Sequence, residues 1–308
     1  MRDKRLNTSL LLGNGPNRIT AGHISWEQVL KQLAAYTRDR EVLKYSAEKP
    51  FPLLYEELAI RCIRRGKLES DLKKRVANLM KEMVPTGLHQ RIVACGFRHI
   101  ITTNYDYCLE IASGAAAEPT NLREEKRYSL FRRRRLGNTY VWHIHGEIDR
   151  PRTITLGHDH YVGYLGRIKD YVVWDRKTND PKSDAKHSVF IQRKKEFEDE
   201  KTLPYSWVDV FLRDDIHILG FTLDYSEIHL WWLLIFKERL RLKAAKYSSV
   251  PRVGSTTFYN ICEEPIPDSV RGKLSLLESI GVQTENVDCD RGYEHAYHTV
   301  LGRILEHA

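Results

Sequence analysis

The sequence predicts an α/β fold with a Rossmann-like, mainly parallel sheet, helices on both faces and a helical insertion. Three observations lead to this class. Short apolar runs rich in β-branched residues alternate with segments of helical periodicity. Several of these runs end at a glycine or a short polar side chain, as strands do in doubly wound sheets. At 308 residues the chain could form two average domains, but the continuous alternation favours one domain with insertions.

The first element is an apolar strand with a glycine turn at residues 9–15 (SLLLGNG), followed by an amphipathic helix at 24–33. Strand, glycine turn and helix form the phosphate-binding opening of dinucleotide folds, where Gly13 and Gly15 would let the backbone approach a pyrophosphate. Arg18 stands where the third glycine of G-x-G-x-x-G would be. An ordinary strand-to-helix turn is therefore the alternative interpretation.

The next strand begins at His99 and ends at an Asn-Tyr-Asp turn, residues 104–106, in front of a helix. This turn is either a ligand-binding strand end or an Asx turn that caps the helix. The later predicted elements are a strand at 139–145, a helix at 207–212, a strand at 216–220, a helix at 227–242, a strand at 256–262, a helix at 268–280, a strand at 281–287 and a last helix ending at 305.

We expect a single domain over residues 1–308. Its core comprises residues 8–26, 96–113, 139–160 and 207–308, with a helical insertion at about 27–95 and basic or mobile insertions at about 114–138 and 165–205.

The bulk composition restricts the class of protein. The five cysteines form no C-x-x-C pair, so neither a disulfide framework nor a zinc ribbon is predicted. No run has the roughly 18 apolar residues of a membrane span, and residues 1–7 are too polar to begin a signal peptide, so we expect a cytoplasmic protein without membrane contact. The net charge of +8 favours an anionic partner, which includes a nucleotide.

Two further sequence features bear on function. Arg132, Arg133, Arg134 and Arg135 are adjacent and could contact nucleic acid, although such runs are usually solvated. His143 and His145 follow each other at strand spacing, which places them on one side of the pleat. They could bind a metal ion, but no further ligand cluster accompanies them in the sequence, so no metal site is expected.

The strand ends together resemble one family. Residues 103–106 (TNYD), His145-Gly146 and residues 220–223 (GFTL) occur in the order and approximate spacing of the sirtuin-like (SIR2) superfamily, whose NAD pocket is built from such turns. Residues 13–15 (GNG) with Ser25-Trp26 resemble the opening of its bacterial, defence-associated branch, and Asn260 resembles the asparagine that contacts the adenosine ribose. The first loop departs from the family's G-A-G-x-S spelling.

The resemblance implies an NAD+ nucleosidase. Sirtuin deacylases carry a four-cysteine zinc ribbon that this chain lacks, whereas family members without the ribbon often hydrolyse NAD to nicotinamide and ADP-ribose as effectors of abortive antiphage defence. NAD is then the substrate and no metal is required. In this interpretation Asn104 binds a ribose hydroxyl or the attacking water, His145 is the general base with an ordinary pKa of about 6.5, and Asp106 orients the turn or a ribose hydroxyl. The remaining predicted NAD-binding residues are Gly13, Asn14, Gly15, Thr103, Gly220, Thr222 and Asn260.

Two other functional classes remain open. One is an NAD or ADP-ribose sensor without turnover, and the other is a nucleic-acid-associated regulatory subunit. The resemblance also implies a homo-oligomer, or a complex with a helicase/ATPase-like or argonaute-like defence partner, because an NAD-consuming effector must stay silent until it is triggered.

Overall fold

The computed structural model describes residues 7–19, 23–114, 118–119, 128–173, 206–247 and 250–307. Within them the strands form one sheet in the order β3-β4-β5-β2-β1-β6-β7-β8. From β5 to β8 in this order all neighbours pair parallel, whereas β3 and β4 add an antiparallel edge. The strands are β1 Thr8–Leu12, β2 His99–Thr102, β3 Glu118–Pro119, β4 Arg134–Leu136, β5 Thr139–His143, β6 Asp215–Leu219, β7 Thr256–Cys262 and β8 Gln283–Asp288. The predicted α/β class with a mainly parallel sheet is confirmed.

Helices cover both faces of the sheet because its strands are apolar on both sides. Leu10 and Leu12 of β1 face one hydrophobic core and Leu11 faces the other, as the two-residue period of a strand requires. One face packs against α5 Gly87–Ala94, α6 Cys108–Ser113 and α13 Tyr293–His307. The other packs against α7 His158–Val173, α10 Trp207–Arg213, α11 Ile228–Ala244 and α12 Asp268–Ser279.

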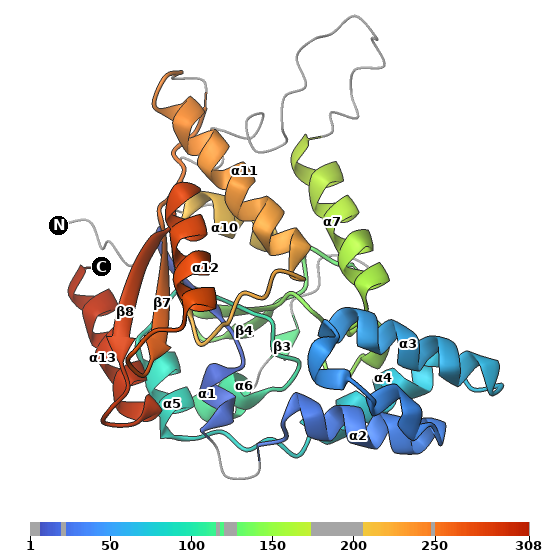
Figure 1. Ribbon diagram of the computed structural model, residues 1–308. Helices are drawn as coiled ribbons and strands as arrows, with labels where there is room; N and C mark the ends of the chain where they lie inside the picture. Colours follow the sequence, from blue (N-terminus) through green and yellow to red (C-terminus); the bar gives the residue numbers. More distant parts are fainter. Residues whose placement is uncertain are drawn as a thin grey trace, which may run out of the picture.

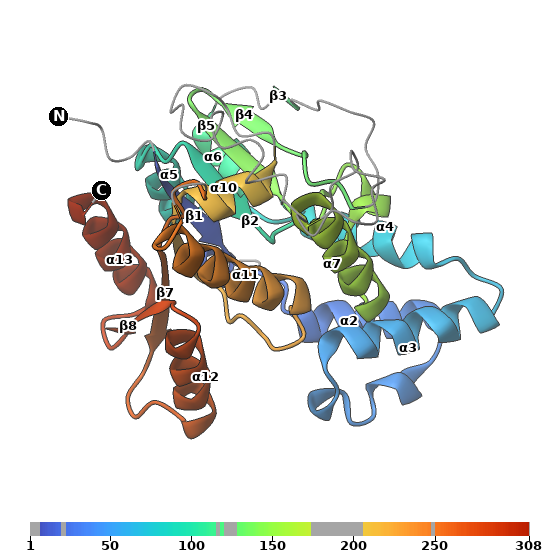
Figure 2. The same cartoon turned by 90° about the horizontal axis from the view of Figure 1, so that it is seen from above.

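The helical insertion has a hydrophobic core of its own. It contains α2 Trp26–Thr37, α3 Phe51–Arg64 and α4 Glu69–Met80, which stand beside the sheet in both views (Figures 1 and 2). Tyr105, Ile148 and Ile154 from the sheet's loops join this core and dock the insertion. α5, which lies within the predicted insertion, packs on the sheet instead. Directly after the glycine turn the chain forms the single-turn helix α1 Gly15–Arg18, so the longer predicted helix at 24–33 belongs to the insertion.

Parts of two predicted insertions belong to helices or strands of the core instead. In the predicted insertion at 165–205, residues 165–173 instead belong to α7, which continues to Val173 and buries Tyr164 and Ile168 in the core. Residues 174–205 lie outside the described residues. In the predicted basic or mobile insertion at 114–138, Arg134–Leu136 form β4. Residues 115–117 and 120–127, which include three further basic residues of this segment, lie outside the described residues.

The arginine block is largely engaged inside the protein. Arg132 is buried and donates to the carbonyl of His143 at 3.1 Å. Arg133 is also buried and lies 4.9 Å from the Trp142 ring centre. Arg134 forms an ion pair with the buried Glu147 at 3.2 Å. Within the block, Arg135 is the exposed member. Arg132, Arg133 and Arg134 thus have partners within the protein that do not involve a nucleic acid. The predicted nucleic-acid contact gains no support from the structure.

In the described part of the chain, none of the helices combines the length and the apolar character needed to cross a bilayer.

Candidate functional site

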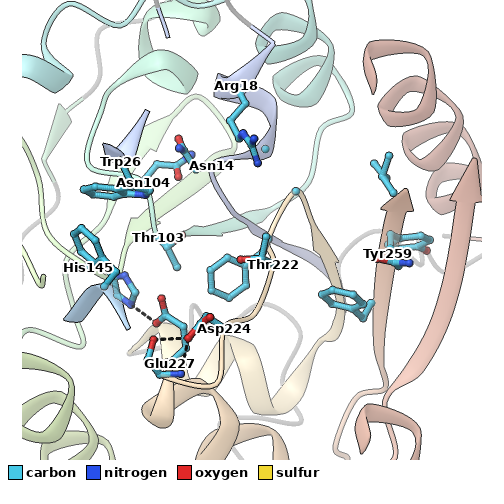
Figure 3. A pocket seen from close by; sticks show the side chains of 18 of the residues that line it. Asn14, Arg18, Trp26, Thr103, Asn104, His145, Thr222, Asp224, Glu227 and Tyr259 are labelled. Carbon is cyan, nitrogen blue, oxygen red and sulfur yellow. Dashed lines mark hydrogen bonds and ion pairs between the residues drawn. The ribbon is translucent and has the colours of Figure 1, made fainter. Parts of the chain in front are cut away.

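A cavity of about 630 Å³ opens at the carboxyl ends of the parallel strands (Figure 3). Its lining comes from the turns after β1, β2, β5 and β6, from β7 itself and from α12 and α13. Trp26, Phe51 and Met80 of the helical insertion complete one wall. Ligands in open α/β sheets bind at this position. The predicted residues that line the cavity are Asn14, Gly15, Thr103, Asn104, Asp106, His145, Gly220, Thr222 and Asn260, whereas Gly13 is not among its lining residues.

The glycines of the first turn allow two loops to approach each other. The amide of Gly15 donates to the carbonyl of Gly220 at 2.7 Å. A Cβ atom on Gly15 would lie 2.0 Å from the hydroxyl of Tyr297 and 2.7 Å from Cα of Gly220, and a Cβ on Gly13 would lie 2.4 Å from the Gly220 carbonyl oxygen. The small size of both residues therefore allows this close loop packing. The approach of a pyrophosphate to the same turn stays a prediction.

Asn104 is held by three hydrogen bonds. Its side-chain amide donates to the carbonyl of Gly13 at 3.1 Å, and its backbone N–H donates to the Thr102 hydroxyl at 3.1 Å. Its carbonyl accepts a hydrogen bond from Nδ1 of His143 at 2.9 Å. The Asn104 side chain is thus fixed at the cavity wall with one N–H and its amide oxygen remaining for a ligand.

His143 supports this arrangement and was not predicted as a site residue. Burial lowers the pKa of its imidazole, but the carboxylate of Glu110, 2.7 Å from Nε2, outweighs burial and raises the pKa to about 9. His143 is therefore protonated at neutral pH and donates from both ring nitrogens, to Glu110 and to Asn104. Glu110 of α6 thereby positions Asn104 through the protonated ring of His143.

Asp106 has a structural position. Its Oδ1 accepts from the amide of Cys108 at 3.0 Å, in an Asx turn at the start of α6, and its Oδ2 accepts from Nδ2 of Asn17 at 2.8 Å. Oδ1 of Asn17 in turn faces Nε2 of His89 at 2.8 Å, while Nδ1 of His89 accepts from the amide of Thr86. Asp106 therefore orients the turn, one of the two positioning roles expected from the sequence, and ties α1 to α6.

His145 lies beyond the end of β5 and does not share a side with His143. The strand ends at His143, and the chain turns at Gly146 with φ of 107°, so the predicted strand to His145 is two residues too long. Nε2 of His145 lies 2.9 Å from Nε2 of His229, and each of these nitrogens lies 3.8 Å from Oε2 of Glu227. The predicted same-side pair of His143 and His145 is therefore wrong.

Burial shifts the ionisation of this cluster. It lowers the pKa of His145 to about 3, in contrast to the ordinary value assumed from the sequence, and it also lowers the pKa of His229. Burial raises the pKa of the Glu227 carboxyl to about 8, although the Tyr161 hydroxyl, 3.3 Å from Oε1, opposes the rise. Both imidazoles are neutral at pH 7. In the short contact one Nε2 carries a proton and donates a hydrogen bond, and the other Nε2 accepts this hydrogen bond.

Tyr161 and Tyr164 of α7 hold the cluster in place. The Tyr161 ring stacks on His229 with centroids 5.2 Å apart and contacts His145 at 5.5 Å, while Tyr164 meets His229 edge-on at 5.4 Å. Glu227, His229 and Tyr161 were not predicted from the sequence. The available signal was the Glu-Ile-His sequence at residues 227–229, after the end of β6, which falls in the predicted apolar helix at 227–242.

The remaining wall offers cations and aromatic rings. Arg18 and Lys273 line the cavity, and Nζ of Lys273 donates to the carbonyl of Thr222 at 2.9 Å. Tyr259 lies across the cavity from Asn104 and His145, with Thr222 between the two sides (Figure 3), and Phe221 and Phe258 add further aromatic lining. On β7, Nδ2 of Asn260 donates to Oδ1 of Asn286 at 2.9 Å. The cavity thus has one end with amide and imidazole groups and another with aromatic and amide groups.

Residues 98–201 match the model of a family described as SIR2-like domain. This segment includes both Asn104 and His145 and spans about a third of the chain. The match supports the SIR2-like superfamily and, at the level of the family, indicates NAD-related activity. None of the curated proteins matches the chain.

Proposed function

We propose that this protein is an NAD+ glycohydrolase that releases nicotinamide and ADP-ribose. One observation carries the proposal: Asn104 and His145 line the same cavity, and both lie in the segment that matches a SIR2-like domain. They come from the turns after the neighbouring parallel strands β2 and β5. Such a pair can hold a ribose and a water at the same carbon atom.

The cavity is suitable for a dinucleotide. A volume of about 630 Å³ lies within the range of roughly 300–1,000 Å³ that is common for small-molecule sites. The rings of Phe258 and Tyr259 can pack on the adenine, and Arg18 and Lys273 supply positive charge for the diphosphate. Asn260 can bind the adenosine ribose, which leaves the nicotinamide ribose for Asn104 and His145.

The reaction requires little acid catalysis. Cleavage of the nicotinamide glycosidic bond develops positive charge on the ribose, and the pyridinium leaves as neutral nicotinamide. The protein must hold the ribose and present a water in the correct position. The fixed amide of Asn104 can bind a ribose hydroxyl or that water, because a single N–H is engaged by Gly13.

His145 is the proposed proton acceptor. Its low pKa makes it a weak base, but a water that attacks an oxocarbenium-like carbon becomes strongly acidic as the new C–O bond forms. A weak base of the correct geometry can therefore take the proton late in the reaction. Nε2 of His229 lies 2.9 Å from Nε2 of His145, so His229 can receive the proton from it.

We further propose that NAD depletion serves abortive antiphage defence. The support is the sequence resemblance to the defence-associated branch of the SIR2 superfamily. On this basis the protein acts as a homo-oligomer, or together with a helicase/ATPase-like or argonaute-like partner that triggers it.

The test is a product assay. Purified protein is incubated with NAD over a range of protein concentrations, and nicotinamide, ADP-ribose and its cyclic form are separated by mass spectrometry. In parallel, NAD is measured in bacteria that express the protein. We expect nicotinamide release by the wild type, and a loss of at least 100-fold in Asn104→Ala and His145→Gln, which matches the usual effect of removing one catalytic group.

Two outcomes contradict the proposal. Equal nicotinamide release by the wild type and Asn104→Ala would mean that the reaction does not occur at this site. Stable NAD binding in calorimetry with no nicotinamide formed, in the test tube and in cells, would instead identify an NAD or ADP-ribose sensor. Circular dichroism of each variant shows whether it is folded.

A further inference from the structure

We infer that His145, His229 and Glu227 form a binding site for a divalent transition-metal ion of the Zn²⁺ class at the base of the cavity. The three ligand atoms lie within 4.8 Å of one another. His145 lies in the loop after β5, and Glu227 and His229 lie at the start of α11. His145 and Glu227 are 82 positions apart in the sequence. No metal site was expected from the sequence, because no further ligand cluster accompanies His143 and His145 there.

The distances among the ligand atoms fit a small cation. The two Nε2 atoms are 2.9 Å apart, and Oε2 of Glu227 is 3.8 Å from each. A triangle with these sides contains a point about 2.1 Å from all three corners, which equals the usual Zn–N and Zn–O bond lengths of about 2.0–2.2 Å. An ion can therefore enter with very small side-chain movements.

The chemistry of the donors selects the class of ion. Two imidazoles and one carboxylate are the ligand set of catalytic zinc sites, whereas Mg²⁺ and Ca²⁺ prefer oxygen ligands. Both histidines are neutral, so each ring has one nitrogen lone pair. Metal binding requires that the proton on the Nε2–Nε2 contact moves to Nδ1 of its own ring and that Glu227 releases its proton to solvent, so the affinity rises with pH. His145 and Glu227 also line the cavity, which leaves an open position for a water and a route by which the ion can enter.

The cluster also contains polar atoms without hydrogen-bond partners among the described residues. Oε2 of Glu227 and Nδ1 of His229 are buried and have no hydrogen-bond partner among the described residues. A metal ion would satisfy Oε2 of Glu227 directly. Nδ1 of His229 would still lack the acceptor that usually supports a metal-bound histidine, so we expect reversible binding rather than a permanent structural ion.

The surroundings preorganise the ligands. The Tyr161 ring lies against both imidazoles, and its hydroxyl donates to Oε1 of Glu227, the oxygen that is not needed for the metal ion. Bound metal would occupy Nε2 of His145. If the proposed hydrolysis of NAD is correct, the ion inhibits it by removing the proton acceptor; this consequence rests on the proposed function, but the binding does not.

The experiment measures binding directly. Full-length protein is treated with a chelator, dialysed and titrated with ZnCl₂ in a calorimeter and with CoCl₂ in a spectrophotometer. We expect one Zn²⁺ per chain, the visible absorption of Co²⁺ in a low-coordinate nitrogen and oxygen site, and a Zn²⁺-dependent rise in Tm. His229→Gln and Glu227→Gln should each weaken Zn²⁺ binding by at least tenfold. The latter variant retains an oxygen for the Tyr161 hydroxyl and so guards against a general loss of folding.

The controls separate this site from others. His295 and His298 are exposed on α13, and their exchange for glutamine should leave the affinity unchanged. Absence of Zn²⁺ binding by the folded wild type, or equal affinity in His229→Gln and Glu227→Gln, would overturn the metal site. Strong sulfur-to-Co²⁺ absorption would place the ion on cysteines and overturn it as well. NAD hydrolysis without metal binding contradicts only this inference, whereas Zn²⁺ binding without NAD hydrolysis contradicts only the proposed function.

Discussion

The side-chain amide of Asn104 donates to the carbonyl of Gly13 at 3.1 Å and thereby joins the turns that follow two neighbouring strands, β2 and β1. Gly13 in turn donates its N–H to the carbonyl of Leu219 at the end of β6. Three adjacent strand ends are thus linked by two hydrogen bonds. The position of Asn104 is consequently determined by the sheet itself as well as by its own turn.

The exchange Asn104→Asp tests this link. The aspartate has nearly the same shape, but it replaces the N–H donor by an oxygen that faces the Gly13 carbonyl. We expect the free energy of unfolding at pH 7 to fall by about 1–3 kcal/mol, and by more than in Asn104→Ala, because the alanine leaves no repelling charge. Urea denaturation of both variants measures the difference. Wild-type stability of Asn104→Asp would show that the hydrogen bond is unimportant.

The exchange Asp106→Ala tests whether Asp106 is a structural residue. It removes the acceptors for Cys108 and Asn17, both in buried surroundings. We expect a loss of about 1–3 kcal/mol in the free energy of unfolding. Nicotinamide release per folded molecule should fall less than in Asn104→Ala. A fully stable but inactive Asp106→Ala protein would instead assign Asp106 a direct catalytic role.

Much of the fold could be predicted because its signals are local. β7 extends from Thr256 to Cys262 as predicted, since its β-branched and aromatic residues favour a strand and the flanking Gly254 and Pro265 limit it. α7 was not predicted, because Gly163 and Gly166 interrupt its apolar pattern; its tyrosines become core residues only when they pack on Trp207 and His229.

The site could be predicted in part for the same reason. Asn104 and His145 follow strand ends, which the sequence reveals. The partners of these residues depend on tertiary contacts instead. Glu110 faces His143 only because α6 packs over β5, and His229 meets His145 only because α11 begins beside the same strand end. No spacing in the sequence encodes these distances, and burial, which sets the pKa of His145, is likewise a tertiary property.

The exchange Gly15→Ala tests the close packing of the two glycine loops. The new methyl group would meet the Tyr297 hydroxyl and Cα of Gly220, so we expect a loss of about 1–3 kcal/mol in the free energy of unfolding from overpacking. The matched control is Gly272→Ala on the exposed side of α12, where the added Cβ meets no atom within 4 Å and helix propensity predicts a gain of up to about 1 kcal/mol.

A double variant identifies the atom responsible. Tyr297→Phe removes the nearest obstacle, the hydroxyl group. Gly15→Ala should therefore lower the free energy of unfolding less in the Tyr297→Phe protein than in the wild type. Equal costs in both backgrounds would contradict a clash with Tyr297 and leave the Gly220 backbone as the cause.

The pH dependence of stability follows from buried neutral histidines, of which His99 on β2 is the clearest test. Burial, together with Arg213, Arg98 and Arg133, holds the pKa of His99 well below 6.5 in the folded protein, and Nδ1 of His99 accepts from Nε1 of Trp142 at 3.3 Å. The unfolded chain therefore binds a proton below about pH 6.5 that the folded chain excludes.

The contribution of His99 to the free energy of unfolding consequently falls as the pH decreases below about 6.5, by up to about 1.4 kcal/mol per pH unit. His89, whose pKa is also lowered by burial, adds to the slope. Urea denaturation between pH 6.5 and 5 measures how steeply the free energy of unfolding changes with pH. We expect His99→Gln to reduce this slope by the amount that corresponds to about one proton. The exchange of the exposed His295 for glutamine should leave the slope unchanged. The same slope in His99→Gln and the wild type would mean that His99 takes up its proton in the folded state as readily as in the unfolded chain, which is incompatible with its burial on β2 and with the positive charges of Arg213, Arg98 and Arg133.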